Sequence, residues 1–203
     1  MTLAASWEAA HPRMPPEVLR TLELSNAPEL QSLVVLAAIP EFEVGLPGGE
    51  TTSHTDVLVL ARNETGLVVI AVEGKVDEEF GPTLSSKRTE ASDSQEERLA
   101  YLHDALQLSN PLDGEIRYQL LHRTASAVIV AREFHASAAV MLVHSFSPSR
   151  RWFDDYVAFG EALGIGVVEG RALRAPHLNK PRLYLGWASG DQRFRDVAVP
   201  ASA

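Results

Sequence analysis

Two apolar runs joined by a polar turn form the clearest pattern in the chain. The runs cover residues 57–61 and 67–72, and residues 62–66 between them are polar, charged or glycine. Nearly continuous apolar runs of this length are typical of strands that are buried on both faces. The pattern therefore predicts an antiparallel hairpin of two central strands. Pairing around the turn brings Asp56, just before the first strand, beside Glu73, at the end of the second.

A helix is expected before this hairpin, at residues 27–37. Apolar side chains recur there with helical spacing, Asn26 is a suitable N-cap, and Pro28 stands near the first helical position. Pro40 is expected to end this helix. The alternation of residues 42–46 predicts a short strand, so the order at this point is a helix followed by three strands.

The rest of the chain predicts further elements of both kinds. The first twenty residues predict a polar lead-in, with a helical turn that starts at Pro15-Pro16-Glu17. The later patterns predict a loop at 77–97, helices at 96–108, 115–134 and 152–163, a buried strand at 138–144, and short strands at 166–168 and 181–187. This order predicts a single mixed α/β domain over residues 1–203, with a core at 27–145 and a C-terminal extension at 146–203.

The composition narrows the classes of protein to which the chain can belong. It has 203 residues, an ordinary hydrophobic fraction of 45%, and no cysteine, which excludes disulfides and thiolate zinc sites. No stretch reaches the roughly 18 apolar residues of a membrane span. The first eight residues lack the basic and apolar regions of a signal peptide. We therefore expect a cytoplasmic protein with no membrane partner.

The formal net charge of −9 argues against a general affinity for nucleic acid, because phosphate contacts require Lys and Arg. A local basic groove or a bound cation can still supply positive charge where it is needed. Basic residues do gather at four places, namely Lys87-Arg88, 117–123, Arg150-Arg151 and 171–182. The charge thus restricts a nucleic-acid site to a small part of the surface.

The second strand of the hairpin ends in an acid-x-lysine triplet, Glu73-Gly74-Lys75. Side chains alternate along a strand, so Glu73 and Lys75 project to the same side. Together with Asp56, Glu73 offers the carboxylate oxygens that Mg²⁺ prefers, and water and phosphate would complete the shell. Such a cation polarises a phosphoryl group, while Lys75 would orient the attacking water or stabilise charge on phosphorus. The alternative is a strand-start acid and a surface ion pair.

Asp56 followed by Glu73-Gly74-Lys75 resembles the catalytic signature of the PD-(D/E)XK, or restriction-endonuclease-like, nuclease superfamily. The expected order of helix, three strands, helix and strand over residues 27–145 is similar to the common core of that superfamily. The resemblance implies a central mixed sheet. It also implies Asp56 and Glu73 as ligands of Mg²⁺ or Mn²⁺, and Lys75 as the catalytic lysine.

The resemblance extends beyond the short signature. Residues 72–76 and 117–126 look like segments of an uncharacterised bacterial family with this fold, which supplies no activity to carry over. Thr55 is a departure, because the signature is named for a proline before its first acid. The implied function is metal-dependent hydrolysis of phosphodiester bonds in nucleic acid, with DNA favoured over RNA and a homodimer as an expected assembly. The alternative is a catalytically inactive domain of the same fold that binds protein partners.

Three further side chains are candidates for the same chemistry or for plain structural roles. Gln119 and Arg123 share a polar face of the helix at 115–134, and in related nucleases a polar residue on this helix often completes the site, so Gln119 is a further catalytic candidate. The alternative for both is a solvated helix face. Glu29 is either an extra metal ligand, as in some members of the superfamily, or an acid that favours a helix N-terminus. His144 is expected as a partly buried histidine, since no Gly-x-Ser-x-Gly elbow is present for a His–Asp–Ser hydrolase.

Overall fold

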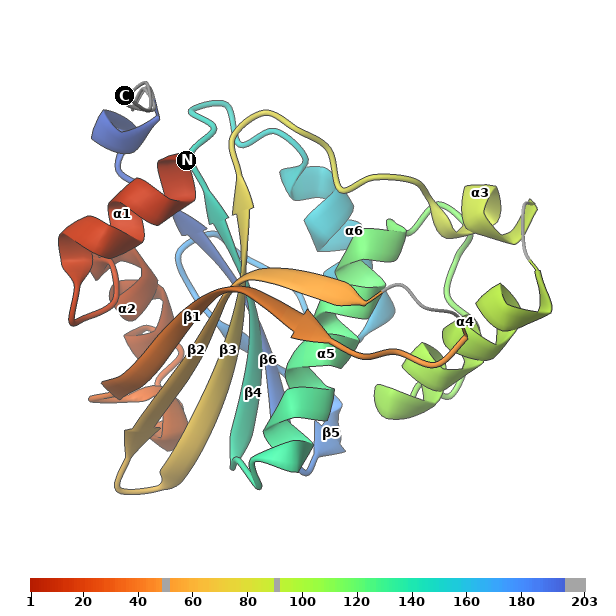
Figure 1. Cartoon of the computed structure of the whole chain (residues 1–203), viewed down its shortest axis with the longest axis horizontal. Helices are drawn as coiled ribbons and strands as arrows, with labels where there is room; N and C mark the ends of the chain where they lie inside the picture. The colour runs from red at the N-terminus through yellow and green to blue at the C-terminus, as the bar shows by residue number, and fades with distance from the viewer. Residues whose placement is uncertain (49–51, 90–91, 196–203) are drawn as a thin grey trace, which may run out of the picture.

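The fold is that of an α/β protein with a single mixed sheet (Figure 1). The structure is a computed structural model, and it describes residues 1–48, 52–89 and 92–195. This described part contains six α-helices, two short 3₁₀ helices and six strands. None of its helices has the length and apolar content that crossing a membrane requires. The expected α/β class is therefore confirmed.

The sheet has the strand order β1-β2-β3-β4-β6-β5. Its first three strands form an antiparallel meander, β3–β4 and β4–β6 are parallel pairs, and β5 is antiparallel to β6. The strands are β1 (Val34–Val44), β2 (Ser53–Asn63), β3 (Gly66–Lys75), β4 (Ala138–Ser145), β5 (Leu173–Asn179) and β6 (Arg182–Ser189). The parallel pairs set the C-terminal ends of β3, β4 and β6 at one end of the sheet.

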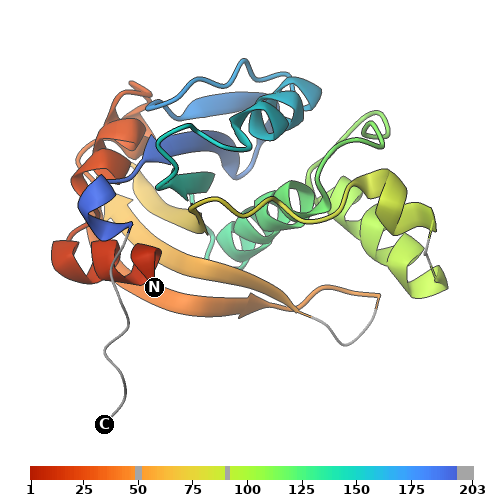
Figure 2. The same ribbon diagram turned by 90° about the horizontal axis from the view of Figure 1, so that it is seen from above.

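Helices cover both faces of the sheet, which gives three layers (Figures 1 and 2). One face packs against α1 (Thr2–Ala10), α2 (Pro16–Glu23) and the 3₁₀ helix η1 (Pro28–Leu30). The other face packs against α5 (Tyr118–Glu133) and α6 (Phe153–Ala162), and α4 (Asp93–Ala105) packs against α5. The short α3 (Leu84–Thr89) follows β3, and η2 (Gln192–Phe194) follows β6.

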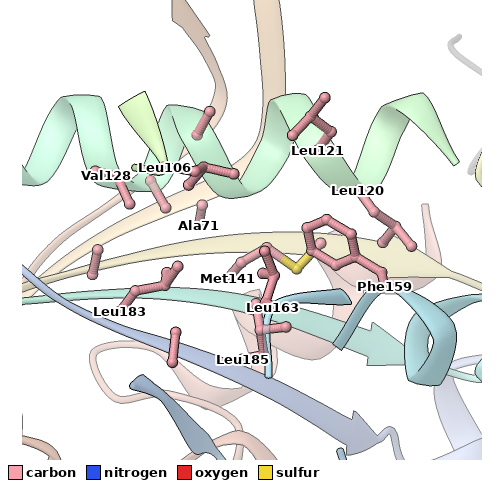
Figure 3. Packing of buried hydrophobic residues seen from close by; sticks show 14 of the residues in the cluster. Ala71, Leu106, Leu120, Leu121, Val128, Met141, Phe159, Leu163, Leu183 and Leu185 are labelled. Carbon is pink, nitrogen blue, oxygen red and sulfur yellow. The ribbon is translucent and has the colours of Figure 1, made fainter. Parts of the chain in front are cut away.

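Helix α5 is the main support of the sheet on its second face. Its residues from Leu120 to Ala131 are buried, with the exception of His122, which is half-buried. Figure 3 shows Leu120, Leu121 and Val128 of α5 above Ala71 of β3 and Met141 of β4. Burial of such side chains contributes roughly 1.5–3 kcal/mol each. Helix α5 is therefore held firmly in place, which fixes the backbone positions from which its polar side chains project.

The predicted hairpin and the later regular elements are confirmed. Strands β2 and β3 pair antiparallel from Asn63–Gly66 to Val57–Val72, and both are interior strands with apolar residues that are buried. The helices expected at 96–108, 115–134 and 152–163 correspond to α4, α5 and α6. The strands expected at 138–144 and 181–187 correspond to β4 and β6.

The helix expected at 27–37 is wrong. Only η1 is helical there, and the backbone of Ser32 is left-handed, with φ 50°, before β1 begins at Val34. Apolar residues with helical spacing could satisfy either pattern, and the β-branched Val34 and Val35 favour a strand. Pro40 ends no helix but lies inside β1, where an edge strand tolerates a residue without an N–H. The strand expected at 42–46 is the last part of β1.

Three smaller expectations also need correction. The loop expected at 77–97 contains α3 and the start of α4. Residues 166–168 form no strand, since Val168 makes only an isolated bridge with Arg171. The N-terminal lead-in contains α1 and α2, although the turn expected from Pro15-Pro16-Glu17 does begin a helix at Pro16. Strand β5 had no prediction, because its residues combine Pro176 with scattered polar positions.

Candidate functional site

The candidate site lies where β2 and β3 separate. Their pairing ends at Val57–Val72; β2 then stays with β1 as far as Ser53, while β3 stays with β4 as far as Lys75. In Figure 1 the two strands part near the middle of the sheet, and the outer halves of β1 and β2 cross in front of α5. The sequence-predicted residues Asp56, Glu73 and Lys75 lie at this separation.

The Asp56 side chain accepts a main-chain hydrogen bond where the pairing of β2 with β3 has ended. Its Oδ2 accepts a hydrogen bond from the Gly74 N–H at 2.7 Å, so a side chain replaces the carbonyl partner that β2 no longer offers. The space around Gly74 is narrow. A Cβ there would lie 3.0 Å from Leu3 Cδ2 of α1 and 3.4 Å from Asp56 Oδ2. A glycine between Glu73 and Lys75 therefore allows α1 and Asp56 to approach β3 closely.

Glu73 is the centre of a buried network of hydrogen bonds. Its Oε1 accepts from Lys75 Nζ at 3.0 Å and from Gln119 Nε2 at 2.7 Å, and its Oε2 accepts from Arg123 Nε at 2.7 Å. Lys75 Nζ also donates to Gln119 Oε1 at 3.1 Å. Glu73 is 3% exposed and Lys75 is 4% exposed. The structure therefore brings Glu73, Lys75 and Gln119 together, and it adds Arg123 as a direct partner of Glu73.

Arg123 connects this network to the start of β2. Its Nη1 donates to Ser53 Oγ at 3.0 Å, and the same oxygen is 2.9 Å from His122 Nδ1. The spacing of four between Gln119 and Arg123 places both on one face of α5, as the sequence indicates. Ser53 had no signal in the sequence, because its position depends on how the outer half of β2 bends across α5.

The electrostatics of Asp56 differ from those of an ordinary surface acid. Burial and, secondly, the negative charge of Glu73 raise the pKa of Asp56 to about 6. The Gly74 N–H, Arg123 and Lys75 act in the opposite direction, without cancelling this rise in pKa. Asp56 and Glu73 therefore lie close enough for like-charge repulsion, which a cation between them would relieve.

The donor set fits a divalent cation only in part. Two carboxylates can hold Mg²⁺ or Mn²⁺ when water and substrate phosphate supply the other ligands. Asp56 Oδ2 already accepts a hydrogen bond from the Gly74 N–H, and both carboxylate oxygens of Glu73 accept hydrogen bonds as well. Among residues 1–48, 52–89 and 92–195 there is no group of three or more His, Cys, Asp or Glu side chains suited to a metal. A cation at Glu73 would therefore have to displace at least one of its present donors.

Cavities lie on both sides of this site. Asp56 and Gly74 line a cavity of about 570 Å³ that α1 and β1 also border. Gln119 lines a second cavity, of about 510 Å³, between α5 and residues 78–82. Lys75 borders both cavities. The acid of β2 and the glutamine of α5 are thus reached from different sides, and Lys75 lies between them.

The two other candidates lie elsewhere and have structural partners. Glu29 is buried at η1, where it accepts a hydrogen bond from the Tyr184 hydroxyl and pairs with Arg182, at the opposite end of β6 from the candidate site. Neither expected role of Glu29 is needed to explain its position. His144 is fully buried, and its Nε2 is 3.0 Å from Glu17 Oε1, which fixes α2 to β4.

Comparisons with known proteins identify a family but no activity. A search of curated proteins and a search of solved structures each returned no match. A family model matches residues 1–192, which is nearly the whole chain. The chain therefore belongs to the family described as "Domain of unknown function (DUF6946)".

Proposed function

We propose that this protein is a metal-dependent nuclease that hydrolyses phosphodiester bonds in nucleic acid. The order of α2, the β1–β2–β3 meander, α5 and the parallel β4 supports a restriction-endonuclease-like core. The observation that carries the proposal is the position of Asp56 beside Glu73-Gly74-Lys75 at the separation of two central strands, with the pKa of Asp56 raised by burial and by Glu73.

Each residue has a role that follows from its contacts. Asp56 and Glu73 would hold Mg²⁺ or Mn²⁺, which supplies charge stabilisation at the phosphoryl group and lowers the pKa of a bound water. Lys75 and Gln119 hydrogen-bond each other and Glu73, so they are positioned to orient water or a phosphoryl oxygen. Arg123 would turn from Glu73 Oε2 to a phosphate oxygen, an exchange of one anion for another.

The remaining expectations belong to the same proposal. The substrate is nucleic acid, with DNA favoured over RNA. A cytoplasmic location and a homodimer stay predictions. The negative overall charge makes productive binding depend on the local cations around the site and on the metal.

Calorimetry with Mn²⁺, followed by cleavage assays on single- and double-stranded DNA, tests the nuclease directly. The wild type should bind Mn²⁺, Asp56→Asn and Glu73→Gln should bind it at least about 10-fold more weakly, and Lys75→Met should lower cleavage by about 100-fold or more. Glu64→Gln in the exposed β2–β3 turn removes the same charge outside the site and should leave both values unchanged. A wild type that binds no Mn²⁺ at millimolar concentration would overturn the proposal.

A second candidate function is a non-catalytic domain that binds protein partners. The complete set of hydrogen bonds to Glu73 favours it, because Lys75 and Arg123 already pair with this carboxylate, which then needs no metal for charge balance. The same calorimetry separates the two functions. Absent metal binding, together with a lowered free energy of unfolding in Lys75→Met, would support the non-catalytic domain, because Lys75 is then a structural partner of Glu73.

A further inference from the structure

A groove runs along α5 beside the candidate site. One cavity, of about 510 Å³, is lined by Lys75 and Gln119, and another, of about 450 Å³, is lined by Ser53 and Arg98. The two cavities share Lys87, Tyr118 and His122 and are therefore adjacent. We call this pair of cavities the α5 groove. In Figures 1 and 2 the outer halves of β1 and β2 extend across α5 towards α4, next to this region.

The α5 groove collects positive charge on an acidic chain. Lys87 Nζ lies 5.7 Å from the centre of the Tyr118 ring, and Arg98 Nε donates to the Pro47 carbonyl at 2.9 Å, which holds its guanidinium at the cavity wall. These charges act on His122, which lines both cavities. Burial, followed by the charges of Arg123, Arg98 and Lys87, lowers its pKa to about 3. His122 is therefore neutral at physiological pH. The positive charges of Arg123, Arg98 and Lys87 all lie near enough to act on its imidazole ring.

Among the described residues, the acids that line the groove already accept hydrogen bonds, and its neutral groups suit an anion. Glu79 pairs with Arg117 at 3.1 Å, and Glu78 Oε2 accepts the main-chain N–H groups of Val76 and Asp77. The cavity near Arg98 also has hydroxyl groups, from Thr52, Ser53, Ser92 and Ser94. Hydroxyls and cations together are the usual donors to phosphate oxygens.

We propose that the α5 groove binds the phosphate backbone of a single nucleic-acid strand, with Lys87 as its central contact; this rests on the proposed nuclease function. The groove begins at Lys75 and Gln119, so a strand lying in it would continue directly from the site of cleavage. Cavities of about 450 and 510 Å³ have the size of small-ligand sites, which suits a few nucleotides of one strand. Positive grooves with an aromatic side chain are typical of single-strand binding.

Fluorescence anisotropy with a labelled single-stranded oligonucleotide, in EDTA so that no metal contributes, tests the groove. The informative pair is Lys87→Gln and Arg88→Gln, because these neighbours on α3 lose the same charge but only Lys87 lines the groove. Lys87→Gln should weaken binding about 3- to 10-fold and reduce the salt dependence by about one phosphate contact. Arg88→Gln should stay within about 2-fold of the wild type.

Equal losses of oligonucleotide affinity in Lys87→Gln and Arg88→Gln, or no binding by the wild type, would overturn the proposal that the α5 groove binds a strand. A duplex that competes as well as the single strand would overturn the choice of a single strand. Cleavage assays in Mn²⁺ keep the two proposals apart. If binding depends on Lys87 but no cleavage occurs, the groove is supported and the nuclease proposal is wrong. If cleavage occurs and Lys87→Gln does not change it, the nuclease is supported and the groove proposal is wrong.

Discussion

At the scale of single residues, Glu73 carries a buried charge that depends on its neighbours. Lys75 and Arg123 both pair with it, and the carboxylate is 3% exposed. Removing one partner of a buried ion pair usually costs about 3–5 kcal/mol, because the charge that remains is uncompensated. Arg123 should therefore contribute more to stability than an arginine on the surface of the same helix.

Arg123→Met is expected to lower the free energy of unfolding by about 3 kcal/mol, measured by urea denaturation at pH 7. Arg132→Met, an exposed arginine in the last turn of α5, should change it by less than about 0.5 kcal/mol. If Arg123→Met and Arg132→Met lower the free energy of unfolding by similar amounts, the ion pair between Arg123 and Glu73 contributes little to stability.

Asp56 predicts a pH dependence of stability with a defined sign. Its pKa is raised from an ordinary 3.8 to about 6, so the folded state binds the proton more tightly than the unfolded state. The resulting stability is present below pH 4 and is lost as the pH rises from about 4 to about 6. Asp56→Asn keeps an acceptor for the Gly74 N–H and removes the charge.

Asp56→Asn should therefore be more stable than the wild type at pH 7.5, and the difference should vanish at pH 4. The full change in pKa corresponds to about 3 kcal/mol, at roughly 1.4 kcal/mol per pKa unit. Partial exposure of Asp56 to water reduces the expected gain to about 1 kcal/mol. Urea midpoints at the two pH values provide the measurement, and a gain of the same size at both would refute this account.

At the scale of elements, the contact between α1 and β3 depends on Gly74. A Cβ at this position would lie 3.0 Å from Leu3 Cδ2 and 3.2 Å from Leu3 Cβ, so Gly74→Ala should lower the free energy of unfolding by about 1 kcal/mol. Combining it with Leu3→Ala should give less than the sum of the two losses, because the closest contact, with Leu3 Cδ2, is then absent. Gly45→Ala, where a Cβ has open space, is the control. Additive losses in the double variant would place the strain elsewhere.

The sequence correctly predicts those elements whose hydrophobic pattern fits only one kind of secondary structure. The runs at 57–61 and 67–72 are too short and too apolar for a surface helix, and their pairing followed from the turn. Residues 27–37 have apolar positions that fit a helix, but from Val34 onward they also fit a strand, and pairing with β2 makes this part a strand. Gln119 and Arg123 could be placed from helical spacing, whereas Ser53 could not, because it hydrogen-bonds Arg123 from 70 residues away.

At the scale of the whole molecule, charge is distributed unevenly around the sheet. The chain has a formal net charge of −9, so its average field repels a polyanion. The cations Lys75, Lys87, Arg98 and Arg123 nevertheless gather at one end, where β2 and β3 separate and α5 begins. A substrate strand would therefore be repelled by the average field and attracted where these cations gather, which raises selectivity at the expense of association rate.

The hydrogen bond between Asp56 and the Gly74 N–H lowers the entropy that the Asp56 side chain would lose on binding a ligand. An acid on an open strand rotates freely and must be immobilised when a ligand arrives, which weakens binding by about 0.5–1.5 kcal/mol. Asp56 has already lost this freedom, because the Gly74 N–H holds one carboxylate oxygen when the chain folds. Its other oxygen consequently keeps one direction before any ligand is present, so folding itself prepares the side chain for binding.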